Sequence, residues 1–248
     1  MRTVDKAIEL LGYFSEAQPE FGLSELSRTT GFDKATTHRL LLALIKHDYI
    51  EQSASTKNYR IGSGVLRLAK VREINSPLEV IYKPLLSELV TNTGETAHFS
   101  IFSGGKISTI AVVECTKAVR IHFYLGEEAA IHATASGIVA LAFSNQQRID
   151  KVLNNKLESF TEKTITDRVE LLSLLDTVGN QGYFINQGMY DRDICSIAAP
   201  VFNQAFEPIG AIAVSLPSLR FTTESQTNIL HWVLKAAANA SKALGAKA

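Results

Sequence analysis

The segment that most constrains the fold runs from residue 23 to residue 61, where two helical patterns are separated by a short turn containing glycine. Ser24 can cap a short first helix that Gly31 ends, and Asp33 can cap a second helix over residues 34–47. The second helix carries an apolar stripe, made of Leu40, Leu41, Leu44 and Ile45. Such a pair is typical of a helix-turn-helix. The same spacing also occurs in helical domains that bind nothing, so it leaves the function open.

The residues after the second helix predict a small β-hairpin. Residues 49–52 and 59–61 alternate between apolar and polar side chains, and the polar residues 53–58 between them are typical of a turn. A hairpin in this place forms a wing, whose tip can touch the DNA backbone or an adjacent minor groove. We expect Tyr59 to pack on the helices. An amphipathic helix over residues 3–15, ended by Pro19 and Gly22, precedes the motif.

The front of the second helix and the wing carry the side chains that could contact DNA. In a helix-turn-helix the second helix enters the major groove with its N-terminal residues against the base edges. Basic and hydroxyl side chains donate to phosphates and bases, and small apolar groups contact thymine methyls. We expect double-stranded operator DNA as a partner, with contacts from Ser24, Lys34, Ala35, Thr36, Thr37, His38, Arg39, Lys57, Asn58 and Arg60.

Composition adds limits rather than a function. The chain has 25 basic and 25 acidic side chains, of which residues 1–75 hold 11 and 9, so only a faint positive bias favours the first part. Cys115 and Cys195 form no CxxC motif, which argues against a disulfide framework or a zinc site. The chain starts directly with a helical pattern and holds no long apolar run. We therefore expect a cytoplasmic protein without membrane contact, metal or cofactor.

From residue 77 onward the pattern changes to a mixture of strands and helices. Strands in two groups that flank helices predict a largely antiparallel sheet with helices on its faces. Gly104 and Gly105 mark the first hairpin. The expected strands span residues 97–102, 107–114, 119–124, 183–186, 194–202 and 211–216, and the expected helices span residues 78–92, 136–143, 146–154, 168–181 and 223–244.

Several sequence strings, in order over the whole chain, resemble the isocitrate-lyase-regulator (IclR) family of bacterial transcription factors. They are GFDKATTHRLLLAL, YRIGSGVLRLA, HATASG, SIAAPVF, GAIAVSLP and AANASKALG. The resemblance implies an α+β fold: an N-terminal winged helix-turn-helix, a linker helix, and a C-terminal GAF-like effector domain with a largely antiparallel sheet flanked by helices. We expect these parts to span residues 1–62, 63–76 and 77–248. The family also implies a homodimer and often a dimer of dimers.

The predicted linker helix agrees with an oligomer. Its stretch over residues 63–74 is more apolar than an isolated linker should be, through Val65, Leu66, Leu68, Ala69 and Val71. Burial against another chain would account for this composition.

A candidate effector site lies around residues 132–137, where small residues lead into a helix. Backbone N–H groups at a helix start can meet an anion, so a carboxylate effector fits. Alternatively, the small residues only allow close packing, with Thr134 or Ser136 as an N-cap. The resemblance places the effector site at Thr134, Ala135, Ser136, Gly137, Asn186, Met189, Ser196, Ala213 and Ser215.

Four of these candidate positions, together with the neighbouring Gly188, depart from the family pattern. Asn186 replaces an acidic residue, Ser196 a frequent cysteine and Ala213 a serine, while Gly188 and Met189 replace an acidic pair. Losing negative charge eases binding of an anion and makes the site more apolar. The resemblance with these changes implies a small-molecule effector, an organic acid that differs from small keto acids, and the more apolar site leaves room for a larger or aromatic acid.

Two rival readings remain. In the first, the large domain is an enzyme with Cys195 or Ser196 as nucleophile and His98, His122 or His132 as base. No GxSxG, Walker, HExxH or GxGxxG motif supports it, and a cysteine in an apolar strand is usually a buried hydrophobe. His122 is more typical of a strand residue. In the second reading the winged helix serves only protein contacts. We expect a regulator and no enzyme.

Overall fold

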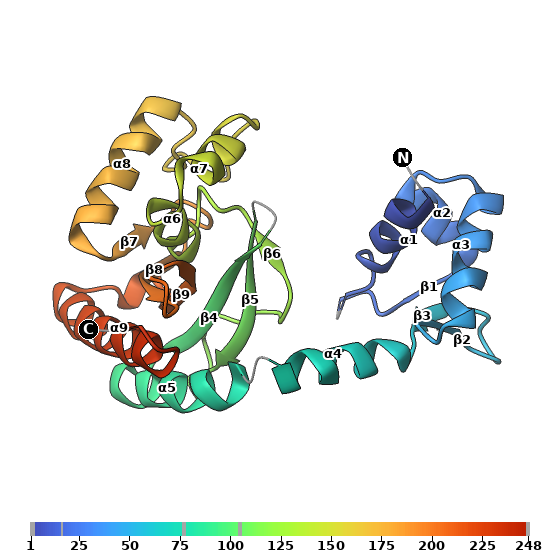
Figure 1. Cartoon of the computed structure of the whole chain (residues 1–248), viewed down its shortest axis with the longest axis horizontal. Helices are drawn as coiled ribbons and strands as arrows, with labels where there is room; N and C mark the ends of the chain where they lie inside the picture. The colour runs from blue at the N-terminus through green and yellow to red at the C-terminus, as the bar shows by residue number, and fades with distance from the viewer. Residues whose placement is uncertain (1–2, 16, 76–77, 104–105, 247–248) are drawn as a thin grey trace. The chain divides into compact units, whose positions relative to one another are not determined.

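The computed structural model describes residues 3–15, 17–75, 78–103 and 106–246 (Figure 1). The chain divides into two compact units, Met1–Pro77 and Leu78–Ala248. The Gly104–Gly105 turn and the boundary expected between residues 76 and 77 lie outside the described residues. None of the helices within the described ranges is long and apolar enough to cross a membrane.

The first unit is a winged helix-turn-helix. Its helices are α1 (Thr3–Leu11), α2 (Leu23–Thr30), α3 (Lys34–Lys46) and α4 (Gly64–Asn75), and its strands are β1 (Glu20–Phe21), β2 (Ile50–Gln52) and β3 (Tyr59–Ile61). The apolar stripe of α3 packs against Leu10 of α1 and Leu26 of α2, which are fully buried. Tyr59 is buried in the same core, as predicted. Burial of this stripe fixes which face of α3 stays exposed.

The helix ends follow from local chemistry, with one correction. The Asp33 side chain accepts a hydrogen bond from the Thr36 amide at 2.8 Å, and Gly31 ends α2 with a φ of +70°, as predicted. Ser24 is not the cap of α2, because the helix begins one residue before it. Gly22 is the N-cap residue, and its N–H donates to the carboxylate of Glu25 at 3.3 Å.

The wing has one more strand than predicted. The expected hairpin forms from β2 and β3, and β1 pairs antiparallel with β3, giving the order β1-β3-β2. β1 is only two residues long, too short for an alternating pattern to be recognised, but Phe21 anchors it in the core. Helix α1 also ends earlier than predicted, at Leu11, because the chain turns at Gly12.

The second unit is a single antiparallel sheet covered by helices on both faces, as predicted. The sheet order is β6-β5-β4-β9-β8-β7, and each of these neighbouring pairs runs antiparallel. Helices α5 and α9 cover one face, while α6, α7 and α8 lie over the other (Figure 1). The elements are α5 (Leu78–Thr93), β4 (Thr96–Ser103), β5 (Lys106–Val113), β6 (Glu128–Ala129), α6 (Ala135–Ala142), α7 (Gln146–Leu153), α8 (Arg168–Gln181), β7 (Phe184–Gln187), β8 (Ile194–Phe202), β9 (Pro208–Pro217), a short 3₁₀ helix η1 (Ser218–Arg220) and α9 (Thr223–Ala243).

The two faces of this sheet separate by residue parity. In β4, Ala97 and Phe99 join the core under α5 and α9, whereas His98 and Ser100 point to the α6 face. In β9, Ile212 and Val214 join the first core, whereas Ala213 packs under α6. Successive side chains of a strand point to opposite faces, so each strand builds a core with one set and offers the other set to the α6 side.

The prediction of a strand over residues 119–124 is wrong. The segment is a loop between β5 and β6, and the neighbour of β5 at that edge is the two-residue strand β6. His122 is therefore a loop residue, also against expectation. The burial of successive side chains does alternate here, since Ile121 and Phe123 are half-buried while His122 and Tyr124 are exposed. It arises because Ile121 and Phe123 turn inward from a loop, and no ladder of hydrogen bonds accompanies it. The other elements expected in the second unit occur within three residues of their predicted bounds.

Candidate effector cavity and DNA-binding face

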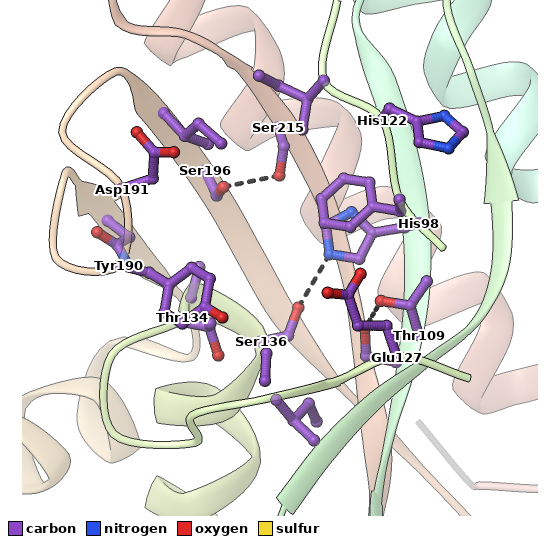
Figure 2. A pocket seen from close by; sticks show the side chains of 18 of the residues that line it. His98, Thr109, His122, Glu127, Thr134, Ser136, Tyr190, Asp191, Ser196 and Ser215 are labelled. Atoms are coloured by element: carbon purple, nitrogen blue, oxygen red, sulfur yellow. Dashed lines mark hydrogen bonds between the residues drawn. The ribbon is translucent and has the colours of Figure 1, made fainter. Parts of the chain in front are cut away.

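The second unit contains a cavity of about 310 Å³, partly open to solvent, on the α6 face of the sheet. Its walls are the polar rows of β4, β5, β8 and β9, the start of α6, the loop before β6, and the turn after β7 (Figure 2). A volume of this size lies at the lower end of the range for small-molecule sites. The cavity is thus placed by strand parity and bordered by two loops.

Hydroxyl groups line the sheet side of the cavity. The register sets Ser196 of β8 directly opposite Ser215 of β9, and their hydroxyl oxygens lie 2.7 Å apart. Ser100 and Thr109 are opposite each other on β4 and β5, with oxygens 3.2 Å apart. Each hydroxyl can donate or accept, so these pairs can reorient toward a ligand without leaving a buried group unpaired.

The start of α6 faces the cavity. Thr134 caps the helix by accepting the Gly137 N–H at 3.2 Å, so capping falls to Thr134 and not to Ser136. Within the described structure the amides of Ala135 and Ser136 have no acceptor, as is usual for a first helical turn. Free amides and the helix dipole together make a partial positive charge at this point. The start of α6 is the electropositive end of the cavity.

Gly137 allows the loop before α6 to pack closely against the helix, although Gly137 itself does not line the cavity. A Cβ at Gly137 would lie 2.2 Å from the carbonyl oxygen of Ile131, so only glycine lets the preceding loop pass so close to α6. The packing role considered for the small residues is therefore real for Gly137, which does not line the cavity. Ala135 and Ser136 do line it.

His98 is the most perturbed group of the cavity wall. Its side chain comes from β4, is 5% exposed, and places Nε2 3.4 Å from the Ser136 hydroxyl. Nδ1 is buried without a hydrogen-bond partner. Burial lowers the pKa of His98 to about 4, so the ring is neutral at pH 7. The ring of Phe123, from the loop before β6, lies over it at a centroid distance of 4.1 Å.

Asn186 lines the cavity, but its side-chain amide forms hydrogen bonds with the backbone. Its Nδ2 donates to the Ala133 carbonyl at 2.7 Å, and its Oδ1 accepts the Met189 N–H at 2.9 Å. The side chain therefore ties the loop before α6 to the turn after β7. Asn186 shapes the cavity rather than offering free hydrogen-bonding groups to a ligand.

Six of the nine predicted effector residues lie together on the cavity wall and three do not. Those on the wall are Thr134, Ala135, Ser136, Asn186, Ser196 and Ser215. Gly137 lies behind it, Met189 is buried in the core between the sheet and α8, and Ala213 is fully buried under α6. Ala213 sits between Ala198 and His98 in the sheet register, where a small side chain lets α6 approach.

Sequence reasoning missed several wall residues. They are Ser100, Ile107, Thr109, Ile121, Phe123, Tyr124, Glu127, Ala129, Tyr190, Asp191 and Ile194, together with His98 and His122, which had been weighed only as bases. The alternation of His98 and Ser100 with Ala97 and Phe99 is a usable signal for the strand residues. The loop residues have no such signal in the sequence, because their positions depend on long-range packing.

Among the described residues, neither candidate nucleophile is hydrogen-bonded to a histidine: the Ser196 hydroxyl pairs with Ser215, and His98 pairs with Ser136. Cys195 and Ser196 are neighbours in β8 and therefore point to opposite faces. Cys195 is buried in the core under α5 and α9, and burial raises the pKa of its thiol. The Nε2 of His132 lies 2.9 Å from the Glu158 carbonyl, away from either candidate nucleophile.

In the first unit, α3 presents a continuous exposed face. Lys34, Ala35, His38 and Arg39 are exposed, and Thr36 is half-buried. Thr37 belongs to the core, because its side chain is fully buried and its hydroxyl donates to the Asp33 carbonyl at 3.0 Å. The sequence analysis did not include Leu42, which is 51% exposed one turn beyond His38 and Arg39.

The wing residues differ in their availability. Lys57 is exposed at the tip with a φ of +61°, and Asn58 beside it is half-buried. Arg60 is engaged across the sheet by Glu51, at 2.5 Å, and by Glu20, at 3.5 Å. The Arg60 side chain is half exposed, and its contact with DNA stays a prediction. Ser24 is exposed in the first turn of α2.

A winged helix-turn-helix joined to an α+β unit that contains a ligand-sized cavity defines a ligand-responsive DNA-binding regulator. Residues 3–54 match the IclR helix-turn-helix domain, and residues 74–242 match the bacterial transcriptional regulator IclR C-terminal domain. The chain belongs to the IclR family of bacterial transcriptional regulators. It is a sequence-specific DNA-binding regulator controlled by a small-molecule effector, and not an enzyme.

Similar proteins cover nearly the whole chain. The regulator XynR of Escherichia coli K12 is 27% identical over 246 residues, which are 99% of this chain and 98% of XynR. The regulator BhcR of Paracoccus denitrificans is 28% identical over 238 residues, 96% of this chain and 85% of BhcR. The crystal structure of an IclR-type regulator from Silicibacter sp. TM1040 is 32% identical with a TM-score of 0.89, covering 99% of this chain and 97% of that one.

Proposed function

We propose that the effector is a small organic acid whose carboxylate binds at the start of α6. The observation that carries this proposal is the pair of amides of Ala135 and Ser136, which have no acceptor among the described residues and belong to residues that line the cavity. Backbone N–H groups at a helix start favour an anion. The hydroxyls of Ser136 and Ser196 lie in the same wall and can donate to carboxylate oxygens.

The apolar part of the cavity favours a ring over a short chain. Ile107, Ile121, Phe123 and Ile194 line it, and neutral His98 adds a flat face. Burying an aromatic ring against such a wall gives more free energy than burying the one or two carbons of a short keto acid. An IclR homologue from Microbacterium hydrocarbonoxydans, 18% identical with a TM-score of 0.84, was crystallised with 4-hydroxybenzoate. We infer a monocarboxylate that carries a ring.

A thermal-shift screen tests this proposal. Benzoate-type acids should raise the melting temperature of the protein more than acetate or pyruvate do, because a ligand that binds only the folded state stabilises it. Ser136→Trp should abolish the rise by filling the cavity beside α6. Ser173→Trp, on the exposed side of α8, is the matched control and should keep it. A response that persists in Ser136→Trp would place the effector elsewhere.

We also propose that the exposed face of α3 and the wing tip contact the operator. Lys34, Ala35, His38 and Arg39 would meet bases and phosphates, and Lys57 would meet the backbone. Arg39→Ala should weaken binding to the upstream intergenic DNA roughly tenfold and flatten its salt dependence. Lys156→Ala, exposed in the second unit, is the control. Equal affinity of the Arg39 variant and the control would contradict this assignment.

We propose that the protein is a cytoplasmic repressor that works as a homodimer, and that two homodimers can pair into a dimer of dimers. The support is apolar surface on the first unit: Val4 and Leu66 are 71% exposed, Ile8 is 63% exposed, and Leu68 and Val71 are 57% exposed. A second copy would cover these side chains and set two recognition helices about 34 Å apart, or a multiple of it. Leu68→Glu should shift the mass measured by sedimentation to that of a monomer. An unchanged mass would exclude α4 as the contact.

A further inference from the structure

The charged side chains that line the cavity are acidic, which is unexpected for a site that binds an acid. Within the described chain no lysine or arginine lines it, whereas Glu127 and Asp191 do. Glu127 immediately precedes β6, and Asp191 lies in the turn between β7 and β8, so two separate loops bring a carboxylate to the same cavity (Figure 2). Both side chains are exposed at its rim.

These two carboxylates lack the partners that neutralise other acidic groups of the second unit. Glu95 is held by Arg220 and Lys117, and Glu128, next to Glu127 in sequence, is held by Lys106. In the described residues no cation pairs with Glu127 or Asp191. Among the groups that the structure describes, the Asp191 carboxylate accepts one hydrogen bond, from the Asp193 N–H at 2.9 Å.

Tyr190 shows that the two carboxylates act on one region. Its phenol lines the cavity, and burial together with the carboxylates of Glu127, Glu158 and Asp191 raises its pKa. Both rim carboxylates are thus within electrostatic reach of the same phenol. A protonated group placed beside Tyr190 would be attracted by both, and a second carboxylate there would be repelled by both.

An independent feature of the same wall also indicates a polar ligand. The side chain of His98 is neutral and only 5% exposed, and its Nδ1 has no hydrogen-bond partner among the described residues. A buried ring nitrogen without a partner is costly, and a ligand group that hydrogen-bonds to Nδ1 would remove this cost. The wall therefore combines an electropositive end at α6, a neutral imidazole, and an electronegative rim.

We propose that Glu127 and Asp191 select an effector that is a zwitterion: a monocarboxylate that also carries a protonated amine. The carboxylate lies at the start of α6, and the amine lies at the rim beside Tyr190. This inference rests on the proposed acid effector and narrows its class. Dicarboxylates are disfavoured, because their second charge meets the two rim carboxylates.

Titration calorimetry with probes that share one scaffold tests the charge preference. The probes are para-(aminomethyl)benzoate, para-methylbenzoate and terephthalate, whose tails are cationic, neutral and anionic. The wild-type protein should bind the aminomethyl compound about fivefold tighter than the methyl compound, the upper end for a solvent-exposed ion pair, and terephthalate most weakly.

Variants separate the rim from the rest of the site. The double variant Glu127→Gln with Asp191→Asn should bind the three probes with similar affinity, and Glu128→Gln, a neighbouring acid that does not line the cavity, should keep the wild-type order. If the acids bind but tail charge changes nothing in the wild type, or the double variant keeps its order, the inference is wrong. If no acid binds, the proposed acid effector is wrong, and the inference falls with it.

Discussion

The buried His98 makes the stability of the second unit depend on pH. Its pKa is about 4 in the folded protein and about 6.5 in an unfolded chain, so the unfolded state binds more protons between these values. Stability contributed by neutral His98 is therefore complete above pH 6.5 and is lost as pH falls toward 4. One unit of pKa is worth about 1.4 kcal/mol, so the full loss is about 3 kcal/mol, of which about 2 kcal/mol has occurred by pH 5.

Urea unfolding measures this loss. Trp232 is the chain's single tryptophan and packs on the core of the second unit, so its fluorescence reports the unfolding of that unit. The free energy of unfolding should fall by about 2 kcal/mol more in the wild type than in His98→Gln between pH 7 and pH 5, because glutamine does not titrate. Working at pH 5 and above keeps most carboxylates ionised.

A matched histidine controls for general acid effects. His231 is exposed on α9, and His231→Gln should retain the wild-type pH dependence of the unfolding midpoint. If the wild type and His98→Gln lose stability in parallel between pH 7 and pH 5, His98 is not the neutral buried group described above.

Three further substitutions test the local structure. Burial opposes ionisation of Glu95, but hydrogen bonds from Arg220 and Lys117 outweigh it and lower its pKa, so Glu95→Gln should destabilise the second unit by about 2 kcal/mol in urea titrations at pH 7, with a loss that shrinks below pH 4.5. Asp33→Ala removes the cap of α3 and should lower the stability of the first unit, followed by circular dichroism, by about 1 kcal/mol. Gly137→Ala should lower the melting temperature and the response to acids, whereas unchanged values would mean that the loop before α6 gives way freely.

Local signals predicted the elements that have strong local causes. Asp33 and Gly31 fixed the ends of the two helix-turn-helix helices because a carboxylate cap and a left-handed glycine act within one turn of chain. Ser24 misled the same reasoning, since Gly22 and Glu25 supply an equivalent cap two residues earlier. A residue type permits a cap without requiring it.

The site was harder to predict than the fold, for reasons of distance along the chain. Thr134 and Ser136 stand in one string, but Glu127 and Asp191 meet at the cavity only because two loops converge over the sheet. The apolar–polar alternation around Phe123 looked like a strand, although the inward side chains face a cavity instead of a packed layer. The ion pairs that Arg60 makes with Glu51 and Glu20 were also not predicted, because they depend on the pairing of β3 with β2 and β1.

The parity of the sheet has a practical consequence for building sensors from this scaffold. His98, Ser100, Ser196 and Ser215 face the cavity, whereas the residues beside them in each strand hold the core on the opposite face. A library confined to these four positions would alter which molecule is detected while leaving the packing under α5 and α9 untouched. Recognition and foldability are thus carried by alternate residues of the same strands, and each can be varied with little effect on the other.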